Sequence, residues 1–141
     1  AFGYDGLMTL LPKETAIAIY KQRYWQDPRF DKVAEYSPRI AEELLDTGVN
    51  MGVGTASKFL QRALNTLNAE GKYYPDITVD GAIGQMTLAS LKAFLAYRGD
   101  NGHVVLVRML NALQGVRYIE IAEAKPSQEA FIYGWFLSRV A

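Results

Sequence analysis

A glycine-rich turn between two helical patterns is the sequence feature that most restricts how this chain folds. The turn is Gly52-Val53-Gly54, and the stretch around it runs from Asp46 to Asn65. Glycine lacks a Cβ atom, so it interrupts a helix and lets the chain change direction at low steric cost. We therefore predict two helices that meet across this turn, and we take residues 46–65 as the centre of the fold.

Both of these helices carry polar side chains among their apolar ones. Asp46 and Asn50 are four residues apart and share one helix face, and Gln61 and Asn65 share another face in the same way. A helix that only had to bury itself would carry leucine or alanine at such positions. The two pairs are therefore candidates for a polar site, or for ties between elements.

Apolar residues recur at helical spacing along most of the chain, which predicts further helices. Two helices are expected to start at Pro12 and at Pro38, the second with Ser37 as its N-cap. Four more are expected over residues 55–70, 85–97, 103–124 and 128–140. The helix at 103–124 is expected to be central and buried on most sides. Residues 29–36 and 99–102 are expected to be connections, and 73–79 could form a short hairpin.

Length and composition indicate one folded domain. The 141 residues, of which 50% are apolar and 21% charged, can bury a sizeable core and are typical of a globular chain. The expected fold class is all-α, with about six helices around a long central helix and at most a small β-hairpin.

Charge and residue content exclude several classes of protein. The 15 basic and 15 acidic residues cancel, which removes the main argument for binding nucleic acid or an anionic membrane. Without cysteine and with His103 as the single histidine, neither a disulfide nor a zinc site is expected, and no metal or cofactor is predicted. No apolar run approaches the roughly 18 residues of a membrane span, and no signal peptide is visible.

Several motifs, taken in their order and spacing, resemble one known family. They are Ala18-Ile19-Tyr20 followed by Tyr24-Trp25, Asp46–Asn50 with Gly52, Leu60-Gln61-Arg62-Ala63-Leu64-Asn65, Asp80-Gly81-Ala82-Ile83-Gly84 and Gly134-Trp135. The family is the lysozyme-like N-acetylmuramidases of glycoside hydrolase family 108, which includes phage endolysins and secretion activators. Residues 1–50 resemble its hydrolase region and residues 51–141 its predicted peptidoglycan-binding segment. The resemblance implies a single lysozyme-like domain over residues 1–141.

The sequence departs from this family at one point that matters for catalysis. The family's catalytic glutamate lies in a Glu-Gly-Gly-Tyr type motif near the N-terminus, and here Gly3-Tyr4 follows Phe2 instead. The resemblance implies that the chain is a fragment that starts after this motif, with no catalytic residue of its own and no activity alone. Glu14 is not a substitute, because a glutamate is expected at a helix start on electrostatic grounds.

The resemblance implies a function in the bacterial cell wall. The intact protein would be a muramidase that hydrolyses the β-1,4 bond between N-acetylmuramic acid and N-acetylglucosamine in peptidoglycan. The alternative, suggested by the missing glutamate, is a non-catalytic peptidoglycan-binding or secretion-accessory domain. We expect a monomer of bacterial or phage origin, made in the cytoplasm, that acts on the cell wall in the periplasm.

The predicted substrate-binding residues are Trp25, Tyr24, Asp46, Asn50 and Gln61. Sugars present apolar faces to aromatic rings and hydroxyl groups to amides and carboxylates, which is why these residue types are candidates.

Each of these residue types also has a structural interpretation. For Asp46 the favoured one is a buried acid bonded by backbone or tyrosine donors, because buried polar groups are usually satisfied internally. Gln61 and Asn65 are favoured to tie the two helices and the glycine turn together. Tyr20 is expected to be a core residue, since aromatic residues at helical spacing usually are. Trp25, beside a loop, is expected to be more exposed.

Overall fold

The structure of the protein is a computed structural model that describes residues 13–140. Its elements are α2 (Lys13–Lys21), a π-helical turn η1 (Gln22–Gln26), α3 (Phe30–Ala34), α4 (Pro38–Met51), α5 (Val53–Thr66), α6 (Gln85–Arg98), α7 (Asp100–Ala124), a 3-10 turn η2 (Pro126–Gln128) and α8 (Glu129–Ser138). No strand forms between residues 13 and 140, so the all-α prediction is confirmed and the small hairpin at 73–79 is absent.

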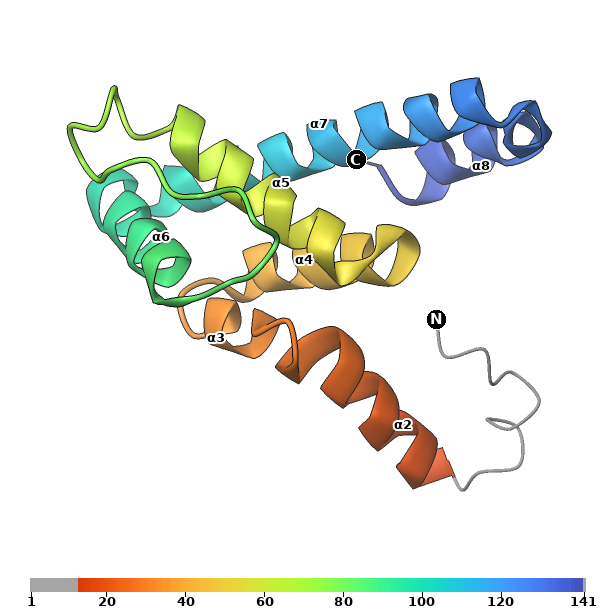
Figure 1. Ribbon diagram of the computed structural model, residues 1–141, viewed down its shortest axis with the longest axis horizontal. Coiled ribbons are helices and arrows are strands. Elements are labelled where there is room, and N and C mark those ends of the chain that lie inside the picture. Colours follow the sequence, from red (N-terminus) through yellow and green to blue (C-terminus); the bar gives the residue numbers. More distant parts are fainter. Residues whose placement is uncertain (1–12, 141) are drawn as a thin grey trace.

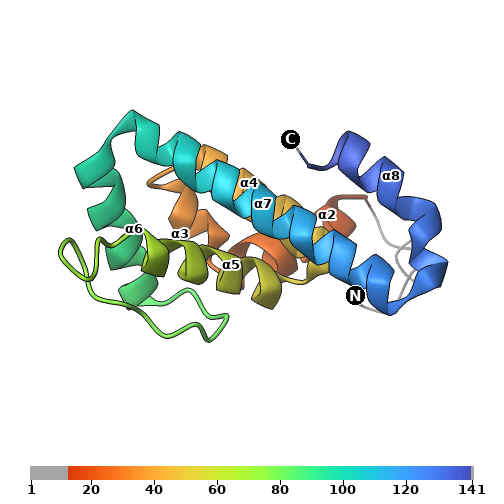
Figure 2. The same ribbon diagram turned by 90° about the horizontal axis from the view of Figure 1, so that it is seen from above.

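The helices are arranged around α4, α5 and α7, which contact one another. Figure 1 shows α6 at one end of this centre, while α2 and the α7–α8 pair project from it as two arms in the opposite direction. Seen from above, the long helix α7 runs over α4 (Figure 2). Because α7 also contacts α6 and α8, the prediction of a long central helix is confirmed.

The junction between α4 and α5 depends on two glycines. Gly52 has a φ of 103°, a backbone conformation that favours glycine, and its N–H donates to the Gly48 carbonyl at 2.9 Å. A Cβ atom on Gly48 would lie 3.2 Å from Val53 Cγ1 and 3.3 Å from the Phe30 ring. The predicted break between two helices is therefore confirmed, and Gly48 allows the close approach of the elements that follow and precede it.

The N-terminus of α4 also forms as predicted. The Ser37 hydroxyl accepts a hydrogen bond from the Ile40 backbone N–H at 3.2 Å, and Pro38 occupies the first helical position. The Ser37 hydroxyl also lies 2.8 Å from His103 Nδ1 on α7. This contact fixes the start of α4 against α7.

A compact apolar core lies under these helices. Its buried members are Phe30, Val33, Ile40, Ala41, Leu44, Ala56, Phe59, Leu60, Ala63, Leu64, Tyr74, Ile77, Ile83, Leu91, Phe94, Leu106 and Leu110. The prediction that residues 29–36 are a connection is wrong, because α3 lies there and buries Phe30 and Val33 completely. Helix α3 has five residues and follows Arg29, whose φ is 63°. Five residues are too few to show a helical apolar period.

Helix α7 differs from its prediction in two respects. It starts at Asp100 rather than at His103, because Gly99 alone, with a φ of 67°, makes the break from α6. It is also buried along one stripe rather than on most sides. Its exposed apolar residues include Val105, Val116 and Ile119, since only one face of the helix meets other elements.

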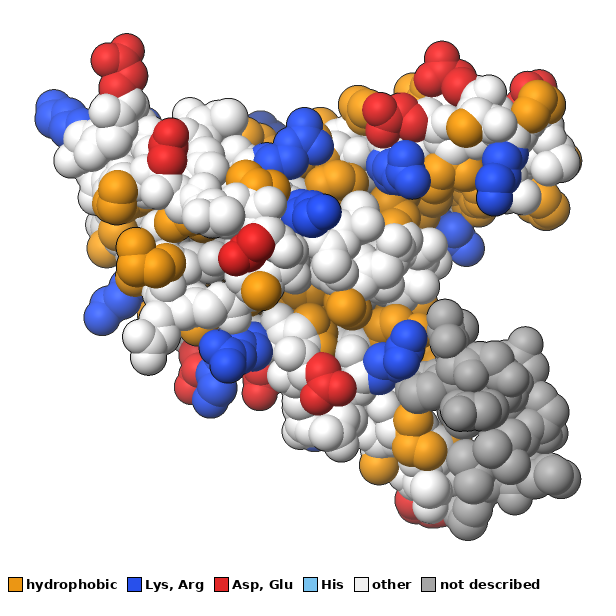
Figure 3. Space-filling model, in the orientation of Figure 1, with side chains coloured by type: hydrophobic (Ala, Val, Ile, Leu, Met, Phe, Trp, Pro, Cys, Tyr) orange, Lys and Arg blue, Asp and Glu red, His pale blue; other side chains and the backbone are white. Residues whose placement is uncertain are grey.

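The arm formed by α7 and α8 carries exposed apolar side chains. Trp135 of α8 stacks on Tyr118 of α7 with ring centroids 4.8 Å apart, yet α8 contains no buried residue. Phe131, Tyr133 and Leu137 are 54%, 79% and 75% exposed. Apolar surface accordingly gathers along this arm in Figure 3.

The segment between α5 and α6 is irregular and is attached to α5 by side-chain hydrogen bonds. Asn65 donates to the Ile77 carbonyl and accepts from the Ile77 N–H, both at 2.8 Å. The Tyr74 hydroxyl donates to the Leu64 carbonyl at 2.8 Å. The Asn65 amide thus satisfies backbone groups that a hairpin partner would otherwise have bonded, which explains why an apolar segment stays without a strand.

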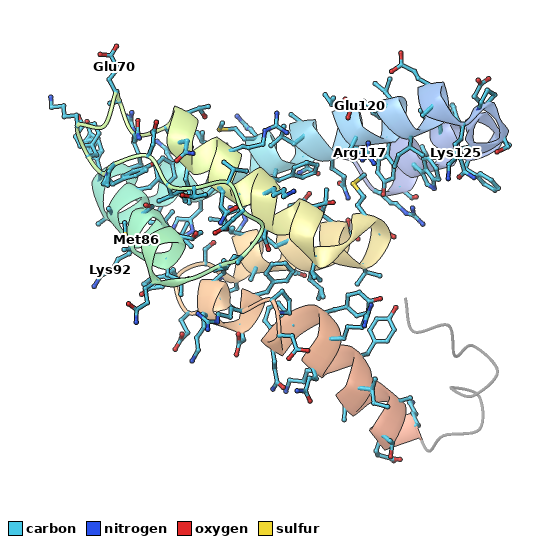
Figure 4. All side chains as sticks on the ribbon, viewed as in Figure 1. Glu70, Met86, Lys92, Arg117, Glu120 and Lys125 are labelled. Carbon is cyan, nitrogen blue, oxygen red and sulfur yellow. The ribbon has the colours of Figure 1, made fainter. Side chains whose placement is uncertain are left out.

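Ion pairing contributes little to this architecture. The pair Arg117–Glu120, labelled in Figure 4 on α7, has a nitrogen–oxygen distance of 3.9 Å and side chains that are 48% and 57% exposed. Pairs of this kind are weak because water and salt screen them. Apolar burial and amide hydrogen bonds hold the described residues together instead.

Candidate functional site

A pocket of about 620 Å³ lies at the contact between α4 and α7. Its lining combines charged, amide and apolar side chains: Arg39, Glu42, Glu43, Leu45, Asp46, Val49, Asn50 and Val107. All of these residues except Val107 come from α4, because residues three and four apart on that helix share its outer flank. We call this cavity the α4–α7 pocket.

Two of the predicted substrate-binding residues, Asp46 and Asn50, meet in this pocket. Asn50 Nδ2 donates to the Asp46 backbone carbonyl at 2.9 Å and to Asp46 Oδ1 at 3.4 Å. The buried Gln114 of α7 donates from Nε2 to Asp46 Oδ2 at 3.3 Å. Asp46 is exposed and its donors are side-chain amides, so the interpretation of a buried acid bonded by backbone or tyrosine groups is wrong.

Glu43 is a residue of this pocket that the sequence patterns did not single out. Its Oε1 atom is buried and has no hydrogen-bond partner among the described residues. Burial raises the pKa of the Glu43 carboxyl from 4.5 to about 7, and the negative charge of Asp46 adds to the rise. Glu43 therefore keeps its proton well above the pH at which an ordinary glutamate loses it.

The signal for Glu43 was present in the sequence but ambiguous. Glu43 lies three residues before Asp46, directly beside the apolar stripe of Ile40, Leu44 and Thr47 that faces the core. Glu42 is its neighbour in sequence, and it is exposed. The two adjacent glutamates point to different sides of α4, and the structure shows that Glu43 is the one on the partly buried side.

A second pocket, of about 600 Å³, contains the predicted aromatic residue Trp25. It is almost entirely apolar and is lined by Lys13, Ala16, Ile17, Tyr20, Lys21, Trp25 and Leu45. Trp25 is partly exposed, as expected. Tyr20 is 45% exposed, so its assignment to the core is wrong, because α2 projects from the centre and its face stays open.

Tyr24, the other predicted aromatic residue, is only 9% exposed. Its ring centroid lies 4.7 Å from that of Tyr20, and the Arg23 guanidinium carbon lies 5.8 Å from its ring centroid. Tyr24 thus packs against the exposed ring of Tyr20 and supports it. Leu45 lines both pockets, so the pocket of Trp25 and the pocket of Asp46 are neighbours.

Gln61 lies elsewhere, on α5 beside the turn at residues 80–84. Its Nε2 atom contacts Asp80 Oδ1 at 3.0 Å, the Ala82 carbonyl at 2.9 Å and Thr87 Oγ1 at 3.2 Å. Its Oε1 atom accepts from the Gly81 N–H at 2.9 Å. Because Gln61 is 1% exposed and its amide is occupied, the structure favours a structural role for it over substrate binding.

The segment that Gln61 holds forms a turn around Asp80 and Gly81. Asp80 Oδ1 accepts from the Ala82 N–H at 2.9 Å, and Gly81 has a φ of 79°. The Ala82 N–H, followed by the Gln61 amide, lowers the pKa of the Asp80 carboxyl. Gln61 and Asn65 therefore tie α5 to the segment before α6, and not to the glycine turn as we expected.

Two other features, a metal-binding cluster and a membrane-spanning helix, are absent from the described residues. Between residues 13 and 140, no three histidine, cysteine or acidic side chains lie close enough to hold a metal ion. Over the same range, no helix combines the length and the apolar character needed to cross a membrane.

Comparisons with protein families divide the chain at the glycine turn. Residues 55–140 match the family described as predicted peptidoglycan domain. Residues 3–52 match the family described as glycosyl hydrolase 108. A search among curated proteins found no significant match.

Proposed function

We propose that this chain, which belongs to the predicted peptidoglycan domain family, is part of an enzyme that hydrolyses the glycan strands of peptidoglycan. The observation that carries the proposal is the order of the two matches, a glycosyl hydrolase 108 segment followed directly by a peptidoglycan segment. The reaction we propose is the muramidase reaction, hydrolysis of the β-1,4 bond between N-acetylmuramic acid and N-acetylglucosamine.

The packing supports treating the two matched segments as one lysozyme-like domain over residues 1–141. Phe30 and Ile40, from the first segment, belong to the same buried cluster as Leu64 and Leu106 from the second. Helix α4 contacts both α5 and α7 across the boundary. A substrate bound to α4 would therefore be supported by both segments.

Within this proposal the exposed side chains of the two pockets form the sugar-binding surface. Trp25 would stack on the apolar face of a sugar ring, and Asp46 with Asn50 would bond its polar groups. Tyr24 would hold the ring of Tyr20, which lines the same pocket as Trp25, in place. Gln61 would act at a distance, by fixing the turn at residues 80–84.

Glycosidic cleavage also needs a proton donor at the leaving oxygen. No Glu-Gly-Gly-Tyr motif occurs in these 141 residues. We assign the donor to a motif glutamate of the intact protein that lies outside them, while this chain supplies the walls of the cleft.

The test is an assay of the intact protein on purified peptidoglycan. We expect release of muropeptides, and a loss of rate of about 100-fold or more when the motif glutamate is changed to glutamine, because a general acid contributes on that scale. The reducing-end sugar of the products identifies the bond that is cut. An intact, folded protein that releases no muropeptides would contradict the proposal.

The second candidate function is a non-catalytic peptidoglycan-binding or secretion-accessory domain, which the match of residues 55–140 to the predicted peptidoglycan domain favours. Sequence determination upstream of Ala1 separates the two. A Glu-Gly-Gly motif just upstream would exclude the second function, whereas a reading frame that starts near Ala1 would support it. In the latter case the chain should co-sediment with insoluble sacculi, and failure to do so would exclude the accessory function too.

A further inference from the structure

We propose that the α4–α7 pocket binds a neutral N-acetylated sugar ring, and that Glu43 serves there as a neutral carboxylic acid that donates a hydrogen bond to the ligand. The inference rests on the proposed function, because it takes the ligand to be a sugar of peptidoglycan. It goes beyond that function by assigning a subsite, a preference for uncharged sugars and a pH dependence.

The first argument is the state of the Glu43 carboxyl. Its Oε1 atom is buried without a hydrogen-bond donor among the described residues, so an ionised carboxylate there would carry charge on an unsolvated oxygen. A neutral carboxyl avoids this cost and presents one O–H donor. Glu43 lines the α4–α7 pocket, and because Oε1 is shielded from solvent we assign the O–H donor to the other carboxyl oxygen, Oε2.

The second argument is that the neighbouring acid, Asp46, is held in a fixed position by side-chain amides. Asp46 accepts hydrogen bonds from Asn50 and Gln114 through its two carboxylate oxygens. Gln114 is wholly buried, and its Oε1 atom has no partner among residues 13–140. The Gln114 nitrogen donates to Asp46 while the buried Gln114 oxygen accepts no hydrogen bond from the described residues. An unpaired buried acceptor costs free energy, which a purely structural contact does not explain. We infer that Gln114 serves to hold Asp46 beside Glu43.

The third argument is the charge and shape of the pocket. With Glu43 neutral, the charged side chains of the lining are Arg39, Glu42 and Asp46, which leave one net negative charge. Leu45, Val49 and Val107 supply apolar wall. A negative pocket disfavours an anionic ligand, and apolar wall beside a donor suits an uncharged N-acetylglucosamine ring with its acetamido carbonyl.

The pH dependence follows from these groups. The titratable side chains that line the pocket are Glu42, Glu43 and Asp46, all from α4, and α7 faces it with Val107. The donor is present below the pKa of Glu43, about 7, and is lost as the pH rises through that value. Binding of a neutral sugar should therefore weaken about tenfold between pH 6 and pH 8, as the protonated fraction falls.

The experiment measures binding of the tetramer of β-1,4-linked N-acetylglucosamine to the full chain between pH 5 and pH 8.5. Calorimetry gives the dissociation constant, and carbon-13 NMR of the glutamate carboxyls gives the titration of Glu43 with and without the tetramer. We expect the tenfold loss of affinity for the wild type, and a rise in the Glu43 pKa when the tetramer is bound. For Glu43→Gln, whose amide donates at every pH, we expect affinity that does not change with pH.

The matched control is Glu123→Gln, which makes the same carboxyl-to-amide change at an exposed position on α7 outside the pocket lining. It should behave as the wild type. No binding at pH 6, binding independent of pH in the wild type, or an unchanged pH dependence in Glu43→Gln would each overturn the inference. If Glu43→Gln does not fold, the effect of the tetramer on the Glu43 titration decides alone.

The result is separable from that of the peptidoglycan assay. Release of muropeptides by the intact protein, together with tetramer binding that ignores Glu43, would leave the proposed function standing and reject this subsite. Binding that depends on Glu43, without muropeptide release by the intact protein, would support the sugar site and reject the hydrolase.

Discussion

Gln61 and Gln114 are both buried helical glutamines, yet the structure uses them in opposite ways. Gln61 occupies both ends of its amide, with Asp80, Ala82 and Thr87 on the nitrogen and Gly81 on the oxygen. Among the described residues, the Gln114 side chain makes one hydrogen bond, to Asp46, and its oxygen has no hydrogen-bond partner.

The difference shows how to separate a polar group that holds the fold from one that serves a site. A fully bonded amide between α5 and an irregular segment replaces missing secondary structure. An incompletely bonded amide next to a pocket carries a cost that the fold alone does not require. The two regions should therefore respond differently to substitution, and the predictions below follow from the largest expected effect to the smallest.

Replacing Gln61 with leucine should have the largest effect on stability. It leaves the Gly81 N–H and the Ala82 carbonyl without their present partner, and we expect a loss of about 3 kcal/mol or more in the free energy of unfolding. Urea denaturation measures the loss, and hydrogen exchange should show faster opening at residues 76–84. Gln26→Leu at an exposed position should stay within about 0.5 kcal/mol of the wild type.

Replacing Asn65 with alanine should cost about 2 kcal/mol. The substitution removes both hydrogen bonds to Ile77 and leaves a part-buried N–H and carbonyl unpaired. The same denaturation assay applies, and exchange at Ile77 should accelerate. A cost below about 0.5 kcal/mol would mean that the segment before α6 holds its path without the amide.

Replacing Glu43 with glutamine should change stability in a pH-dependent manner. The carboxyl has a pKa of 4.5 when unfolded and about 7 when folded, so the folded wild type loses stability as the pH rises from 4.5 to 7. Because Glu43 is only partly buried, we reduce the expected loss for solvent screening to about 1–2 kcal/mol. Glu43→Gln should match the wild type near pH 4 and exceed its stability by this amount at pH 8.

Chemical denaturation at both pH values checks this prediction. A stability difference between the two proteins that is the same at pH 4 and pH 8 would show that Glu43 titrates as an ordinary exposed glutamate. The inference that Gln114 serves a functional site would then lose its support from Glu43.

Replacing Gln114 with methionine should have the smallest effect. It removes one hydrogen bond of 3.3 Å but also a buried oxygen without a partner, so the stability should stay within about 1 kcal/mol of the wild type. Thermal and urea unfolding measure it. A loss as large as that of Gln61→Leu would place both glutamines in the same structural class and remove the contrast drawn above.

The fold was predictable wherever it depends on residues that are close together in the sequence. The cap at Ser37, the break at Gly52 and the helical class all depend on residues that are near one another in sequence. Helix α3 was not predictable, because five residues hold too little of the helical period. The exposure of Tyr20 depends on where α2 points, which no local pattern specifies.

The site was predictable only in part, for a related reason. The spacing of Asp46 and Asn50 placed them together because one helix carries both. The spacing of Gln61 and Asn65 was equally regular, but their partners lie 12 to 26 residues away along the chain. Glu43 owes its raised pKa to burial and to the charge of Asp46, and the extent of that burial became visible only with the structure.

The junction at Gly52 has a consequence for how such proteins can be assembled in evolution. The two family matches meet between residues 52 and 55, where α4 turns directly into α5. The side chains on both sides of this point share one buried cluster, and Gly48 contacts Val53 across it. The boundary is therefore no crossover point for exchanging modules between genes, because a new partner would have to reproduce the shape of the face that it replaces. The two segments are expected to be inherited together and to change in step.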